Sequence, residues 1–122
     1  MENKIVQQLG SSGDTLSIAE KYYSVLSAIN SLKLTQREIQ LVAFTAIRGS
    51  ISHANVRNDF CEKYATTIPT INNTISKLKK VGMLMKIDGK IKVNPRICLN
   101  FEKNILLEIN LRHGQETSKS EN

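Results

Sequence analysis

Apolar residues recur at helical spacing early in the chain and predict two amphipathic helices there. The first has apolar positions at three- and four-residue steps: Ile18, Tyr22, Val25, Leu26, Ile29 and Leu32. Ser17 and Glu20 have the spacing of a capping box and place its start. Thr35 and Glu38 repeat that cap ahead of the second helix, and Gly49 is placed to end it. The apolar face of this second helix is Ile39, Val42, Ala43, Ala46 and Ile47.

Two further helices are predicted, at 54–65 and 68–81. The apolar positions of the first are Val56, Phe60 and Tyr64. Thr67 is a good N-cap for the second, and Pro69 is tolerated in a first helical turn because its missing N–H would have no partner there. The second helix has the apolar stripe Ile71, Ile75, Leu78 and either Val81 or Gly82. Its outward positions are Thr70, Asn72, Asn73, Ser76, Lys77 and Lys80.

A β-hairpin is predicted after Gly82, which breaks the fourth helix. Asp88 and Gly89 separate two segments in which apolar and basic residues alternate, and an Asp-Gly pair suits a turn that needs two positive φ angles. The alternation directs the lysines outward and four apolar residues toward the core: Met85, Ile87, Ile91 and Val93. A short extended segment is also expected at 50–52.

The segment after the hairpin fits two kinds of element. Residues 107–112 alternate strictly and favour a strand. A helical face is the alternative, formed by Phe101, Ile105, Glu108, Ile109 and Arg112. Because 122 residues is near the usual size of one domain, we expect a single domain over 1–112, α+β and mostly helical, with an arm at 1–14 and a flexible polar tail at 113–122.

The net charge lies in one stretch of the chain. Residues 77–96 hold seven cations and a single anion, Asp88, which gives +6. The rest of the chain sums to zero, since +6 is also the total. A confined basic patch is typical of a surface that meets a polyanion, whereas the ordinary alternative is solvated charge near a helix end.

Other functional classes find little support in the composition. No apolar run approaches the roughly 18 residues of a membrane span, and the first ten residues do not resemble a secretion signal, so a cytoplasmic location is expected. Cys61 and Cys98 stand apart without a metal-ligand pattern, and no cofactor is expected. His53 and His113 have no catalytic constellation around them, so an enzyme is not expected.

The order helix, turn, helix, glycine, basic hairpin resembles a winged helix-turn-helix of prokaryotic or phage type. Residues 66–84 carry the likeness, with the Pro-Thr-hydrophobic start and the Leu-basic-basic-x-Gly-hydrophobic end of a recognition helix, and it extends over 35–94. It implies a winged helix with an extra N-terminal helix, the Asp-Gly hairpin as wing, and a C-terminal strand or helix. It also implies sequence-preferring binding to double-stranded DNA through 68–81 and 83–94, as in transcriptional regulators or replication and packaging initiators.

The chemistry of the exposed residues agrees with that implication. Amide and hydroxyl groups on an outward helix face can bind base edges, and the candidates for base contact are Thr70, Asn72, Asn73, Ser76 and Lys77. Cations beside them can neutralise phosphates and fix the docking. The candidates for phosphate contact are Thr67, Lys79, Lys80, Lys86, Lys90, Lys92 and Arg96.

The sequence allows two further kinds of partner besides DNA, a second copy of the chain and other proteins. A homodimer is expected of a DNA reader because one helix covers few base pairs, and we assign its surface to 18–32, where Ala19, Tyr23 and Leu26 widen the apolar face. The alternative is a non-enzymatic adaptor in phage or virion assembly, located in the virion, that uses the same fold to contact proteins. RNA is less favoured because aromatic residues are 5% of the chain and none lies on the basic face.

Overall fold

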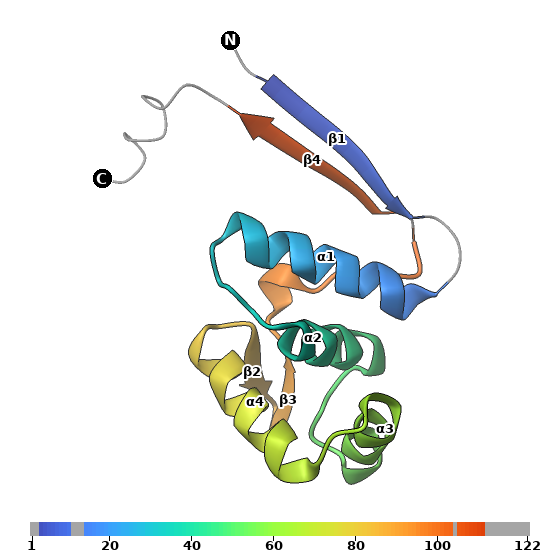
Figure 1. The fold of residues 1–122 in the computed structure, drawn as a ribbon, viewed down its shortest axis with the longest axis vertical. Helices are drawn as coiled ribbons and strands as arrows, with labels where there is room; N and C mark the ends of the chain where they lie inside the picture. Colours follow the sequence, from blue (N-terminus) through green and yellow to red (C-terminus); the bar gives the residue numbers. More distant parts are fainter. Residues whose placement is uncertain (1–2, 11–13, 104, 112–122) are drawn as a thin grey trace.

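The computed structural model describes residues 3–10, 14–103 and 105–111, which form four α-helices and two separate two-stranded antiparallel sheets. The order is β1 (Asn3–Gly10), α1 (Thr15–Ile29), α2 (Gln36–Arg48), α3 (Ala54–Tyr64), α4 (Ile68–Lys80), β2 (Leu84–Ile87), β3 (Lys90–Val93), a 3-10 turn η1 (Pro95–Ile97) and β4 (Ile105–Leu111). Helix α2 lies between α1 and the pair α3 and α4 (Figure 1). The expected class, α+β and mostly helical, is confirmed, and the tail at 113–122 lies outside the described residues.

Helix α1 begins three residues earlier than its sequence pattern indicated. Asp14 is the N-cap, and its Oδ1 accepts the N–H of Leu16 at 3.1 Å. The expected cap at Ser17 and Glu20 is therefore wrong, because both residues lie inside the helix. The helix also stops before Leu32, since the backbone at Ser31 turns into the left-handed region with a φ of 55°.

Helix α2 starts at the predicted capping box and buries a wider face than expected. Thr35 Oγ1 accepts the N–H of Glu38 at 3.2 Å, and Glu38 Oε1 accepts the N–H of Thr35 at 2.8 Å. Leu41 and Phe44 are buried along with the predicted positions, because other helices cover α2 on two sides. Ile47 was expected to point inward, but it lies in the last turn and is 39% exposed.

Two helices end at the predicted glycines. Gly49 is the C-cap of α2 and has a φ of 92°, a conformation that glycine adopts without strain. After α4 the N–H of Gly82 bonds to the carbonyl of Lys79 and the N–H of Met83 to that of Leu78. These are the two bonds of a Schellman motif, which turns the chain directly into β2.

The faces of α3 and α4 largely follow their sequence pattern. The α3 residues Val56 and Phe60 are buried and Tyr64 is half-buried. The N-cap of α4 is confirmed, because Thr67 Oγ1 accepts the N–H of Thr70 at 3.4 Å. The buried stripe of α4 is Ile71, Ile75 and Leu78. Neither Val81 nor Gly82 extends it, and both are exposed because the helix has already ended.

We call residues 84–93 the basic hairpin. Its turn is as predicted, with φ angles of 52° at Asp88 and 80° at Gly89. The cross-strand partners are Leu84 with Val93, Met85 with Lys92, Lys86 with Ile91, and Ile87 with Lys90. Residues paired across antiparallel strands lie on the same face of the sheet, so this register decides which side chains share a face.

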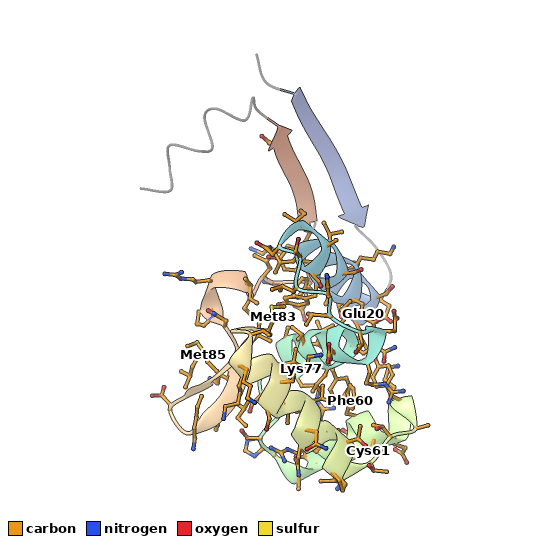
Figure 2. All side chains as sticks on the ribbon, turned by 60° about the vertical axis from the view of Figure 1, so that its left-hand side comes forward. Glu20, Phe60, Cys61, Lys77, Met83 and Met85 are labelled. Carbon is orange, nitrogen blue, oxygen red and sulfur yellow. The ribbon has the colours of Figure 1, made fainter. Side chains whose placement is uncertain are left out.

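The predicted faces of the basic hairpin are wrong for β2. Met85 and Ile87 lie on the face that carries Lys92 and Lys90, because a two-residue turn places Ile87 directly opposite Lys90. Met85 is 40% exposed, and Figure 2 shows it on the outer side of the hairpin. Leu84 enters the core in its place, together with Val93. The expected inward position of Val93 is therefore confirmed.

The extended segment at 50–52 fastens the basic hairpin to the helices. The N–H of Ile51 bonds to the carbonyl of Ile91 at 3.0 Å, and Ser50 Oγ donates to the same carbonyl at 3.1 Å. In return, Ser52 Oγ accepts the N–H of Ile91 at 2.7 Å. A serine hydroxyl thus takes the place of a backbone carbonyl in this short pairing.

We call the pair β1 and β4 the β1–β4 ribbon. Its strands pair from Asn3 opposite Leu111 to Gly10 opposite Ile105. The strand expected at 107–112 is confirmed over the described residues and the helical alternative is wrong, whereas β1 was not expected within the arm at 1–14. Figure 1 shows the ribbon extending away from the helices, with its base beside α1.

Tyr23 is the centre of the core between α1 and the segment after η1. It is fully buried, its hydroxyl donates to the carbonyl of Ile97 at 2.9 Å, and its ring centroid lies 4.9 Å from that of Tyr22 and 5.7 Å from that of Phe101. Ala19 is fully buried too. The expectation that Ala19 and Tyr23 widen a dimer surface is therefore wrong, because the chain itself covers them.

Candidate nucleic-acid interface

Helix α4 presents the amide and hydroxyl groups that the sequence assigned to base contact. Thr70, Asn72, Asn73 and Ser76 are exposed. Because a helix advances about 100° per residue, the positions opposite the buried stripe are Asn73, Ser76 and Lys80. Asn72 lies on the flank toward α3, where it bonds to that helix, and Thr70 lies on the opposite flank.

Lys77, also assigned to base contact, is held in an ion pair. Its Nζ lies 2.8 Å from Oε2 of Glu38, the buried carboxylate of the α2 capping box. Burial alone would raise the pKa of Glu38, but the hydrogen bonds from Lys77 and Thr35 outweigh it and lower that pKa below its usual value. The ion pair of Lys77 with Glu38 therefore joins α4 to the start of α2, and Figure 2 labels Lys77 on α4.

The cations assigned to phosphate contact come from α4, the basic hairpin and η1. Five of them are exposed: Lys79, Lys80, Lys86, Lys90 and Arg96. Lys92 is half-buried, and within the described part of the chain none of these six has an ion-pair partner. Thr67 acts in the α4 cap, since its hydroxyl accepts the N–H of Thr70 and donates to the Thr70 hydroxyl at 3.0 Å.

Arg57 belongs to the same surface, and the sequence analysis missed it. This α3 residue donates from Nη1 to Oδ1 of Asn72 at 2.7 Å and from Nε to the carbonyl of Ile51 at 2.7 Å. An isolated arginine on the polar side of a helix has no periodic pattern that would single it out. Its role depends on the angle at which α3 meets α4, which only the folded chain reveals.

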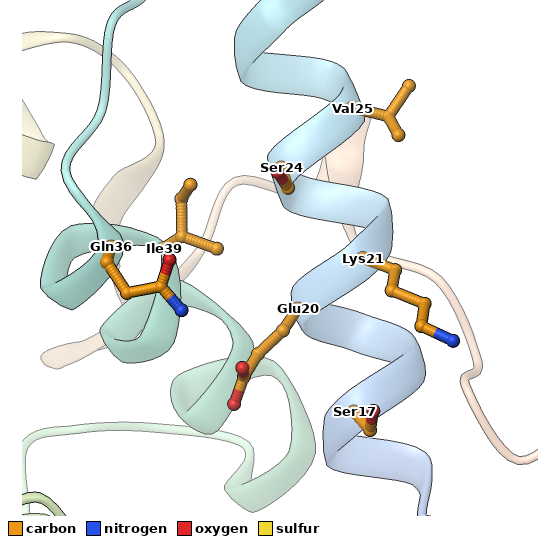
Figure 3. Close-up of a pocket in the computed structure, with 7 residues that line it drawn as sticks. All are labelled: Ser17, Glu20, Lys21, Ser24, Val25, Gln36 and Ile39. Carbon is orange, nitrogen blue, oxygen red and sulfur yellow. The ribbon is translucent and has the colours of Figure 1, made fainter.

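A shallow pocket of about 380 Å³ between α1 and α2 offers no alternative centre of chemistry (Figure 3). Its lining is Ser17, Glu20, Lys21, Ser24, Val25, Gln36 and Ile39. Lys21 and Val25 point away from α2, and the Glu20 carboxylate accepts a hydrogen bond from Tyr64 at 3.1 Å. Burial and the nearby Glu20 charge raise the pKa of Tyr64, so its hydroxyl remains a donor at neutral pH.

Metal-binding groups do not gather in the described ranges, where no three His, Cys, Asp or Glu side chains come together. Cys61 and Cys98 are free thiols, half-buried and exposed respectively. None of the helices in the described part of the chain is long and apolar enough to span a membrane. Comparisons of the chain with protein-family models, with curated proteins and with solved structures gave no match.

Proposed function

We propose that the protein binds double-stranded DNA with α4 and the basic hairpin, in the manner of a winged helix-turn-helix. The observation that carries the proposal is the arrangement of charge on α4: exposed cations that have no ion-pair partner among the described residues lie beside outward amide and hydroxyl groups. Lys77 is paired with Glu38. Lys79 on the flank of α4 and Lys80 beside the outward amides have no ion-pair partner in the described residues, so they are available to a polyanion.

The two kinds of group would have separate tasks on a duplex. Asn73 and Ser76, opposite the buried stripe, would meet base edges in the major groove, where a helix fits. Lys80 at the end of α4 and Lys86 and Lys90 on the hairpin would bind phosphates on either side. Such a protein would serve as a transcriptional regulator or a replication or packaging initiator, working in the cytoplasm.

A salt titration tests the proposal directly. The full chain is titrated against a mixed-sequence duplex of about 25 base pairs, followed by fluorescence anisotropy at several salt concentrations. With the five exposed cations on phosphates, log affinity should fall with log salt at a slope of about −4 to −5. Absence of binding at low salt, or a slope near zero, contradicts the proposal.

A second candidate function is suggested by the β1–β4 ribbon. It is a two-stranded sheet that extends from the helices and leaves the outer edge of each strand without a partner strand in the described residues (Figure 1). Open edges pair readily with strands of other chains. A non-enzymatic assembly adaptor would use them to bind protein. Sedimentation of the pure chain separates the candidates: a monomer without salt-sensitive duplex binding favours the adaptor, and a dimer with such binding favours the DNA reader.

A further inference from the structure

We infer that Arg57 is a positioning residue that fixes the side-chain amide of Asn72 with its NH2 group toward the duplex, so that α4 selects guanine over adenine at that position. The inference rests on the proposed function and deepens it. Two neighbouring asparagines on α4 differ in their side-chain contacts. Arg57 binds the side chain of Asn72, whereas Asn73 has no side-chain partner within the described residues.

The chemistry of the contact fixes which end of the Asn72 amide faces which way. A guanidinium group only donates hydrogen bonds, so the atom 2.7 Å from Arg57 Nη1 must be the amide oxygen. The NH2 group of the planar amide then points away from Arg57. Because Asn72 is exposed, that group is available to a ligand on the surface of α4.

The guanidinium is itself held from a second direction. Arg57 Nε donates to the carbonyl of Ile51 at 2.7 Å, and Ile51 in turn bonds to Ile91 of β3 through its N–H. Arg57 is half-buried between these partners. A continuous series of hydrogen bonds therefore runs from the basic hairpin through 50–52 and Arg57 to Asn72, so the amide is set in a fixed relation to the hairpin that would hold the phosphates.

Base choice follows from that orientation. In the major groove guanine offers two acceptors, N7 and O6, whereas adenine offers the acceptor N7 beside the donor N6. A freely rotating asparagine suits adenine because it can present both its oxygen and its NH2 group. Because Arg57 holds the Asn72 oxygen on its own side, the amide faces the duplex with its NH2 group, and the N6 donor of adenine would meet another donor. Guanine is the matching edge.

The test is selection from a duplex library with randomised base pairs, using the full chain and two variants. The wild type should prefer guanine to adenine at one position by about tenfold. Arg57→Met keeps a long apolar stem and removes the donors, so Asn72 can rotate and present its oxygen to adenine N6 as well. The guanine preference at that position should then fall to within about twofold or pass to adenine. Preferences at the other positions should stay.

A second pair of variants keeps the inference testable if Arg57→Met fails to fold. Asn72→Asp retains the bond to Arg57 and replaces the NH2 group by an oxygen, so it should lose the guanine preference. Asn73→Asp makes the same charge change one residue away and should weaken binding while keeping that preference. Guanine preference that survives in Asn72→Asp, or adenine chosen at that position by the wild type, would overturn the inference.

The same experiment distinguishes a failure of the role of Arg57 from a failure of the proposed function. If the wild type binds duplexes in a salt-sensitive way but shows no base preference, the proposed function stands and the role of Arg57 is overturned. If the wild type binds no duplex, the proposed function fails and the inference fails with it.

Discussion

Two antiparallel two-stranded sheets in this molecule have similar backbones and different surroundings. The basic hairpin buries Leu84 and Val93 in the core, and the segment 50–52 bonds to β3 at Ile91. The β1–β4 ribbon has longer strands but extends away from the helices, with only its base beside α1 (Figure 1). Strand length therefore does not determine how extensively a sheet packs against the rest of its domain.

The difference lies in what each sheet contacts. A two-stranded sheet alone is marginally stable in water, and packing against helices or a third strand is what makes it persist. The basic hairpin packs against the helices and bonds to the extended segment 50–52, which holds it in a fixed position relative to α4. The strands of the ribbon pair with each other, but in the described residues their outer edges have no partner strand, which is the feature that the proposed adaptor would use.

Hydrogen exchange should show the largest contrast between the two sheets. We expect the backbone amides that pair β1 with β4 beyond the base of the ribbon to open with a free energy at least about 2 kcal/mol below that of the Ile91 amide, since this part of the ribbon extends away from the helices (Figure 1). Exchange followed by NMR in the isolated chain measures both. Equal protection would mean that the ribbon is as integral to the fold as the basic hairpin.

Truncation in the hairpin should have the next largest effect and tests its faces. Leu84→Ala removes a side chain that is 1% exposed and should lower the free energy of unfolding by about 2–5 kcal/mol. Met85→Ala, one residue on and 40% exposed, is the matched control and should cost about 1 kcal/mol or less. Chemical denaturation measures both, and a reversed order would contradict the pairing of Leu84 with Val93.

Charge reversal compares the hairpin side of the molecule with the ribbon side. Lys80→Glu with Lys90→Glu should weaken duplex binding about tenfold or more and flatten the salt slope by about two. Lys21→Glu with Lys103→Glu makes the same change in net charge at exposed lysines of α1 and of the turn before β4. That control should keep the slope. Equal losses in both variants would mean that net charge, not the assigned surface, drives binding.

The smallest expected effect concerns the serine that ties the hairpin to the helices. Ser52→Ala removes the acceptor of the Ile91 N–H and should lower the free energy of unfolding by about 1 kcal/mol. Ser24→Ala, at an exposed position of α1, is the control and should change stability little. If the two variants melted alike, the bond to Ser52 would contribute nothing to the anchoring of the hairpin.

Local patterns were sufficient for the elements whose causes lie within a few residues. The capping box at Thr35 and Glu38, the left-handed Gly49 and the turn at Asp88 and Gly89 each depend on neighbours along the chain, and all three are confirmed. The helix α1 cap shows the limit, because Ser17 and Glu20 have capping-box spacing but Asp14 provides the cap earlier.

Long-range partners account for most of what the sequence did not predict. The strand at 3–10 pairs with the strand at 105–111, and the residue pattern of neither segment identifies the other as its partner. Arg57 meets Asn72 because two helices cross at a particular angle. Lys77 was assigned to base contact from its outward position, but Glu38 at the start of another helix binds it. Side-chain identity predicted which groups were polar, and tertiary geometry decided which of them remained free.

The pairing of β1 with β4 also sets the order in which this chain can fold. Gly10 meets Ile105, so the ribbon closes a loop that contains all four helices and the basic hairpin. Closing a loop between such distant residues costs conformational entropy. Contacts of this kind therefore form late, after the local helices and the basic hairpin. During synthesis β1 emerges before the four helices, and its partner β4 emerges only after them. Formation of the ribbon is therefore expected to be the last event in folding.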